Sequence, residues 1–209
     1  MKRKVLLVCH QASLTGAPKS LFNIGKILSS LGYEIITIIN TNGPLKKDFN
    51  TLGECFLWNK YDMSTASIFL KILNKIYNLN NLNRKRIIKN IKNQKNIICL
   101  NNTIANYEIV KYFKKIKIIS WIHELSYMIR ALEINGCNPE SLLKESDFIL
   151  TASKAVGNNL NKKFFLDNSK IYTLYEIIDI EPVKAIKKKN NDFLTVGGCG
   201  SLGWRKGTD

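Results

Sequence analysis

The loop at residues 10–16 is the first place where residue types suited to phosphate chemistry occur. It begins at His10, ends at Gly16 and directly follows an apolar run. Gly16 permits a ligand to approach the backbone closely, and the helix expected after it would present free N–H groups to an anion. The loop lacks the G-x-G-x-x-G fingerprint of dinucleotide-binding proteins. A phosphate-binding loop and an ordinary turn therefore both remain open.

A second candidate site is the segment Trp121-Ile-His123-Glu124, which follows another apolar run. The imidazole of His123 could hydrogen-bond a sugar hydroxyl or exchange a proton near neutral pH. The alternative is a ring that only satisfies a loop carbonyl. The chain has two histidines, and both follow expected strands. That placement makes chance a poorer explanation, and both interpretations remain open.

Two charged clusters near the carboxyl terminus are further candidates. Arg205 and Lys206 precede an expected helix start, where cations are unfavourable unless an anion such as a diphosphate lies between them. A solvated basic loop is the alternative. Asp179 and Glu181 resemble part of a metal-binding acidic triplet, but their place at a linker favours a solvated turn. We therefore expect no metal and no separate cofactor.

The composition predicts a folded chain and limits its partners. It has 209 residues, 45% of them hydrophobic, and a formal net charge of +16. Such a charge could indicate nucleic acid, but 27 Lys against 5 Arg, with 24 Asn and 28 Ile, is typical of a low-GC bacterial genome. Arginine is the residue favoured for reading phosphates and base edges. We therefore expect no nucleic-acid partner.

The cysteines and the apolar runs predict a cytoplasmic location. Five cysteines without a C-x-x-C pair argue against a disulfide framework or a zinc site and indicate reduced, mostly buried thiols. The first apolar run is shorter than the ~7–15 residues of a signal-peptide core, and no run approaches the ~18 of a membrane span. Any membrane contact is expected to be peripheral.

Short β-branched runs alternate with amphipathic stretches along the chain. This alternation predicts an α/β fold, a Rossmann-like parallel sheet with helices on both faces. The expected strands are residues 4–9, 34–40, 55–58, 96–100, 117–122, 148–151 and 171–174. The expected helices are residues 18–31, 64–95 with a break at 78–83, 104–115, 140–146 and 153–165.

The chain is expected to contain one domain and the start of another. Residues 1–180 form the first domain and residues 181–191 a lysine-rich linker. Residues 192–209 repeat the order strand, glycine loop and helix start. A lone strand and loop cannot bury its faces, so we expect a two-domain protein cut just inside its second domain.

Five stretches together resemble the amino-terminal domain of a family 4 glycosyltransferase, a retaining enzyme of the two-domain GT-B architecture. They are the opening strand and loop at residues 5–16, WIHE, DFILTASKAV, KIYTLYEIID and GGCGSLGWRKGTD. The last is the most specific, because family members open their second domain with a strand, a glycine and a Lys-Gly pair.

The resemblance implies transfer of a sugar from a nucleotide diphosphate sugar to a glycan or lipid-linked acceptor, with retention of configuration. It places Gly16 by the phosphates and His123, as the catalytic residue, on the donor sugar. Lys206, with Arg205, would neutralise the diphosphate. The paired glutamates of such enzymes would lie beyond residue 209, so the fragment alone is expected to be inactive.

We assign acceptor binding to His10, Thr15 and Glu124. Three positions depart from the family pattern. Thr15 stands where many relatives have a first glycine, Ser201 replaces an arginine, and Glu176 with its neighbour replaces an Asn-Gly pair. The last departure puts a role for that linker position in doubt.

Two alternatives remain open for the chain as a whole. Residues 68–95, basic and amphipathic, could lie on anionic lipid, or they could form a core-packed helix with a solvated lysine face. The protein could also be a noncatalytic sugar- or nucleotide-binding module rather than an enzyme.

Overall fold

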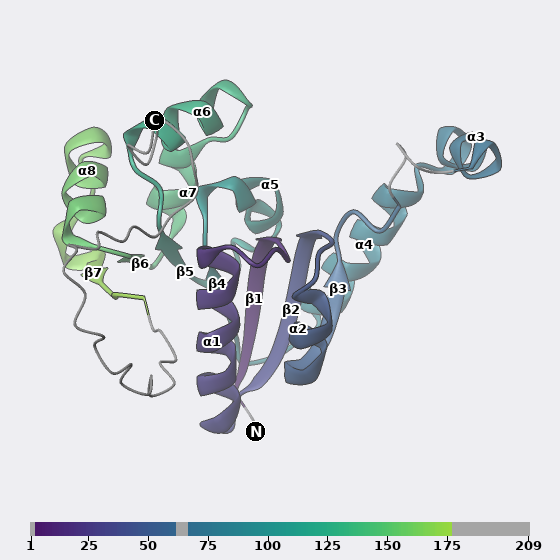
Figure 1. Ribbon diagram of the computed structural model, residues 1–209, viewed down its shortest axis with the longest axis horizontal. Coiled ribbons are helices and arrows are strands. Elements are labelled where there is room, and N and C mark those ends of the chain that lie inside the picture. Colours follow the sequence, from purple (N-terminus) through teal and green to yellow (C-terminus); the bar gives the residue numbers. More distant parts are fainter. Residues whose placement is uncertain (1–2, 62–66, 177–209) are drawn as a thin grey trace, which may run out of the picture. The chain divides into compact units, whose positions relative to one another are not determined.

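The computed structural model describes residues 3–61 and 67–176, which contain a sheet of seven parallel strands. The strand order is β3-β2-β1-β4-β5-β6-β7 (Figure 1). The strands are β1 (Lys4–Gln11), β2 (Glu34–Thr41), β3 (Gly53–Leu57), β4 (Ile97–Asn101), β5 (Lys117–Ile122), β6 (Phe148–Thr151) and β7 (Ile171–Thr173). This order, with helices on both faces, confirms the predicted Rossmann-like fold.

Alternation of side chains along each strand produces two buried faces. In β1, Leu6 and Val8 belong to one hydrophobic cluster, whereas Val5 and Leu7 belong to the other. Successive strand side chains point to opposite faces, so a strand covered on both sides is a continuous apolar run. This explains why the central strands are recognisable in the sequence as short apolar runs; the edge strands β3 and β7 contain no buried residue.

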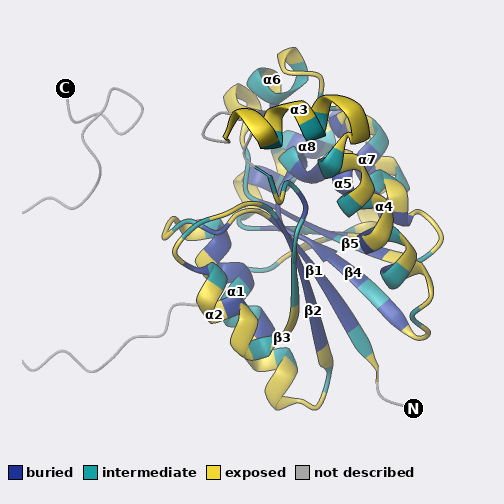
Figure 2. Cartoon of the chain, turned by 90° about the vertical axis from the view of Figure 1, so that its right-hand side faces the viewer, coloured by how far each residue is buried: buried dark blue, intermediate teal, exposed yellow. Residues whose placement is uncertain are grey.

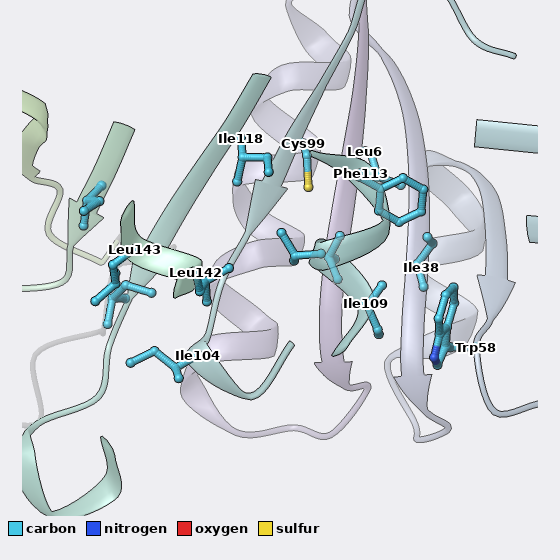
Figure 3. Close-up of a cluster of buried hydrophobic side chains, with 14 of the residues drawn as sticks. Leu6, Ile38, Trp58, Cys99, Ile104, Ile109, Phe113, Ile118, Leu142 and Leu143 are labelled. Atoms are coloured by element: carbon cyan, nitrogen blue, oxygen red, sulfur yellow. The ribbon is translucent and has the colours of Figure 1, made fainter. Parts of the chain in front are cut away.

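Helices cover the two faces unequally. Helices α1 (Gly16–Ser30) and α2 (Lys46–Leu52) cover one face through Leu21 and Phe49. Buried side chains of α4 (Leu79–Lys92), α5 (Tyr107–Val110), α7 (Pro139–Glu145) and α8 (Lys154–Phe164) belong to the cluster on the other face. Figure 3 shows part of this second cluster, including Leu6, Cys99 and Phe113.

Several predicted helix ends are confirmed by their local geometry. Gly32 has φ +85° just after α1, a conformation that favours glycine. The Ser153 hydroxyl accepts a hydrogen bond from the Val156 N–H at 3.3 Å, so it caps α8. Asn78, at φ 46°, separates α3 (Ile68–Tyr77) from α4. The break lies within the predicted range.

Three helical details differ from the sequence predictions. Helix α2 and helix α6 (Ser126–Ile134) were not expected; each buries a single side chain, Phe49 in α2 and Ile129 in α6. The expected helix at residues 104–115 divides into a 3₁₀ turn, the short α5 and a second 3₁₀ turn. Its first 3₁₀ turn is capped by Thr103, whose hydroxyl accepts from the Ala105 N–H at 3.1 Å.

The described residues belong to one unit, which spans residues 1–178. The expected linker at 181–191 and the expected second-domain start at 192–209 lie outside the described residues. None of the described helices is long and apolar enough to cross a lipid bilayer.

Candidate functional site

Loops from three different strands meet at the carboxyl edge of the sheet. Gly16 begins α1 after the β1 loop, His123 follows β5, and Glu176 comes three residues after β7. The His123 Nδ1 lies 3.1 Å from the Glu176 Oε1. A Cβ built on Gly16 would lie 3.8 Å from the nearer Glu176 carboxylate oxygen. Ligands of open parallel sheets bind at this edge, so these residues form the candidate site.

The His123 ring is held in one orientation. Its side chain is 13% exposed, and the ring lies 4.7 Å from the Trp121 ring between centroids. A carboxylate can only accept, so the Nδ1 carries the proton that it donates to Glu176. The Nε2 is buried and has no hydrogen-bond partner among the described residues. It is therefore the ring nitrogen left without a partner, and a ligand that contacts it must first displace the atoms that cover it.

The first turn of α1 is suited to an anion. It has no side-chain cap and no acidic residue, and its first residue is Gly16. The Thr15 hydroxyl is 2.8 Å from the Ser13 hydroxyl and does not cap the helix. Unpaired N–H groups and the helix dipole attract negative charge at such a terminus. Glu176 approaches this same position.

The carboxylate of Glu124 is occupied by contacts within the domain. One oxygen accepts from the Thr103 hydroxyl and from the Ile104 N–H at 3.3 Å. The other accepts from the His123 N–H at 3.1 Å. Glu124 thus joins the loop after β4 to the loop after β5. Its contact with an acceptor stays a prediction.

His10 lies near the end of β1 and remains exposed. Packing around part of its ring lowers the pKa of His10, and the negative charge of Glu124 opposes that shift. His10 is therefore close enough to Glu124 for an electrostatic interaction. Its contact with an acceptor, like that of Thr15, stays a prediction.

Two asparagines after β4 join the loop that follows this strand to α1 and β1 by hydrogen bonds. They were not predicted from the sequence. The Asn102 side chain donates to the Ala17 carbonyl at 3.0 Å and ties this loop to the first turn of α1. The buried Asn106 side chain donates to the Val8 carbonyl at 2.8 Å and to the Asn101 side chain at 2.9 Å. Polar residues directly after a buried strand are the signal that could have found them.

A hollow of about 560 Å³ opens beside the ends of β2 and β3, and it was also missed. The Asn59 side chain donates to the Asn40 Oδ1 at 2.8 Å and accepts from the Arg84 guanidinium. The Asn80 side chain pairs with both backbone groups of Tyr61 at 2.9 Å. In an asparagine-rich chain these residues do not stand out. The lining residues are Asn40, Thr41, Asn42, Leu57, Asn59, Lys60, Tyr61 and Asn80.

The remaining sequence candidates lie outside the described residues. These are Arg205, Lys206 and the acidic pair Asp179 and Glu181. Within residues 3–61 and 67–176, no cluster of three or more His, Cys, Asp or Glu side chains could hold a metal ion. The expectation of a metal-free, cofactor-free protein stays a prediction.

Four cysteines lie in the part of the chain that the structure describes, and their reduced state stays a prediction. Cys9, Cys55, Cys99 and Cys137 are all free, and Cys9 and Cys99 are buried. Burial raises the pKa of Cys9 and of Cys99 to about 12 and that of Cys55 to about 11. Thiols with such pKa values are protonated at neutral pH and are poor nucleophiles.

Comparison with solved structures identifies the fold. The chain is similar to an alpha-glucosyltransferase in complex with UDP-glucose and DNA containing an abasic site, with 13% identity and a TM-score of 0.54 over 85% of this chain and 43% of that chain. It is also similar to TcCGT1 in complex with UDP, with 12% identity and a TM-score of 0.54 over 90% and 54%. The chain spans about half the length of these proteins.

Comparison with families and curated proteins gives one match. No curated protein sequence matches the chain. The family model described as Glycosyl-transferase family 4 matches residues 1–138, which run from β1 through α6 and include Gly16 and His123. The chain therefore belongs to glycosyl-transferase family 4, and its sheet is that of the amino-terminal domain of a GT-B glycosyltransferase.

Proposed function

We propose that this chain forms the acceptor-side half of a glycosyltransferase. The enzyme would transfer a sugar from a nucleotide diphosphate sugar to a glycan or lipid-linked acceptor, with retention. The observation that carries the proposal is the convergence of Gly16, His123 and Glu176 at the carboxyl edge of the sheet. Family membership supports it, as does the UDP or UDP-glucose bound to the two similar structures.

In this proposal His123 contacts the donor sugar through its Nε2. Glu176 accepts a hydrogen bond from the Nδ1–H, so the unprotonated Nε2 can accept one from a sugar hydroxyl. The bond from the anomeric carbon to the diphosphate breaks with its electron pair on the leaving oxygen. The acceptor hydroxyl oxygen forms the new bond to that carbon on the same face, and its proton passes to the leaving diphosphate oxygen. The N–H groups at Gly16, with Lys206 and Arg205, would stabilise the charge that develops there, an interaction that strengthens toward the transition state.

The acceptor would approach past His10, Thr15 and Glu124. The hollow lined by Asn40 and Asn59 adds amide groups that can donate to or accept from sugar hydroxyls. We place an acceptor glycan in this hollow. DNA is present in one similar structure; for this chain, the scarcity of arginine favours an acceptor other than nucleic acid. We further propose a cytoplasmic location for the enzyme.

The test is an assay of nucleoside diphosphate release by the protein that contains residues 1–209. The probes are UDP-glucose, UDP-galactose, UDP-N-acetylglucosamine and GDP-mannose, each with and without an acceptor mixture of simple glycosides. An acceptor-dependent release with one donor, and an α-linked product by NMR, supports a retaining transferase. Saturable binding of a donor without release supports the alternative, a noncatalytic nucleotide- or sugar-binding module.

A further inference from the structure

Helix α3 exposes an apolar face that nothing in the described residues covers. No residue of α3 is buried, although the helix is mostly apolar. Ile68, Phe69, Ile72 and Ile76 are 78%, 69%, 54% and 65% exposed. Figure 2 shows most of this helix in the colour of exposed residues. This excludes the core-packed alternative for α3.

The exposed side chains form one stripe with lysines beside it. Ile68, Ile72 and Ile76 are spaced by four residues and therefore share one side of the helix. Lys71 and Lys75 are exposed and immediately precede two of these isoleucines, so they flank the stripe. An apolar stripe bordered by lysines is the pattern of a helix that lies in a membrane interface, with the lysine ammonium groups among the headgroups.

The charge of the surrounding segment has a single sign. Residues 68–95 contain eight Lys or Arg and no Asp or Glu. Lys85, Arg86, Lys89 and Lys92 on α4 are exposed as well. A surface of this kind attracts an anionic partner over a distance of about a Debye length, ~8–10 Å in physiological salt.

Helix α3 is linked to a helix that packs on the sheet. Ile87 and Ile91 of α4 are buried in the second hydrophobic cluster. At the junction, the Asn74 side chain accepts from the Leu79 N–H at 3.0 Å, and the Asn74 carbonyl accepts from the Asn78 N–H at 2.8 Å. Helix α3 is thus attached to the folded domain through α4.

We propose that α3, with the basic residues of α4, docks on the surface of an anionic lipid bilayer. Lipid satisfies both halves of the surface, because acyl chains cover the isoleucine stripe and anionic headgroups pair with the lysines. Nucleic acid would leave the isoleucines without a partner. A second copy of α3 would bring like charges together. The proposal does not depend on the glycosyltransferase activity.

The test is flotation of the 209-residue chain with vesicles. We compare vesicles of phosphatidylglycerol and phosphatidylcholine with vesicles of phosphatidylcholine alone, at about 50 mM and about 500 mM salt. We expect binding to the anionic vesicles, weakened at high salt. Absence of binding to anionic vesicles at low salt would overturn the proposal.

Two variant pairs separate lipid docking from simple charge attraction. Because α3 buries no side chain, Ile72→Ser with Ile76→Ser should fold normally and lower vesicle affinity by about tenfold or more. The control is Ile134→Ser on α6, an isoleucine that is 78% exposed and should leave the affinity unchanged. Equal affinity in the double isoleucine variant would overturn the proposal.

The contribution of charge is tested with the double variant Lys71→Gln, Lys75→Gln on α3. Its control is the double variant Lys154→Gln, Lys162→Gln on α8, which removes the same charge from another surface. We expect only the first pair to weaken binding strongly. An equal effect of both pairs would indicate adsorption by net charge and would contradict a docking face. Binding of a DNA duplex that is as tight as vesicle binding, and unchanged by the isoleucine variant, would also contradict it.

Discussion

The contact between His123 and Glu176 is the residue-scale feature on which the proposed chemistry depends. Glu176 stands where the family pattern has a different residue, yet its carboxylate reaches the ring at 3.1 Å. The sequence placed His123 correctly after a strand, and it placed Gly16 between the first strand and the first helix, where Gly16 is the first residue of α1. It could not find the contact, because Glu176 is 53 residues away and its position depends on how β7 pairs with β6. The register of that pairing is set by contacts between residues far apart in the sequence, so it cannot be derived from local sequence patterns.

We predict that Glu176 acts as a positioning residue. Glu176→Ala removes the acceptor that holds the His123 Nδ1 proton, so we expect turnover to fall by about tenfold. Glu176→Gln keeps an acceptor oxygen and should retain more activity than the alanine variant. The turnover of each variant is measured as the steady-state kcat and KM for nucleoside diphosphate release. Equal loss in both variants would refute positioning through the hydrogen bond.

A second residue-scale prediction concerns Gly16. A Cβ there meets nothing closer than 3.8 Å, so Gly16→Ala should fold normally and gain up to about 1 kcal/mol of stability at a helix start. The added methyl group would block the approach of a phosphate, so we expect weaker binding of UDP-glucose by calorimetry.

The control for that variant is Gly32→Ala. It has open space around it but a φ of +85°, so it should lose about 1 kcal/mol of stability and leave ligand binding unchanged. Unchanged UDP-glucose binding in Gly16→Ala would remove the first turn of α1 from the site.

At the scale of elements, strands were predicted better than helices. The central strands are runs of buried apolar residues that can be recognised without knowing their partners, whereas α2 and α6 bury only Phe49 and Ile129. Their formation depends on the sheet and loops they contact. The hollow beside β2 and β3 was missed for the same reason, because it arises where Asn40 and Asn59, 19 residues apart, meet.

The loops after β1 and β2 pack so closely that a single methyl group should separate them. A Cβ on Gly43 would lie 2.2 Å from the Ala12 carbonyl oxygen, which accepts from the Leu45 N–H at 2.9 Å. We expect Gly43→Ala to lower the free energy of unfolding by about 1–3 kcal/mol. Urea denaturation measures it. Unaltered stability would show that the two loops are free to move apart.

At the scale of the whole molecule, burial of thiols makes stability depend on pH. The folded pKa of Cys99 is about 12, above the value of about 9 in the unfolded chain. Its contribution is therefore complete below pH 9 and is lost as pH rises from 9 to 12, by at most about 1.4 kcal/mol per pH unit. We expect the wild-type unfolding free energy to fall more steeply over this range than that of Cys99→Ala. Parallel curves would contradict the burial of this thiol.

The central claim for the whole protein is that its carboxyl edge contacts the sugar of a nucleotide-sugar donor. The most direct measurement is the rate of nucleoside diphosphate release by the protein that contains this chain, with and without His123→Ala. We predict a ten- to thousandfold lower rate in the variant, on the order of other polar transition-state contacts, with an unchanged unfolding temperature. A wild-type rate in His123→Ala would contradict it.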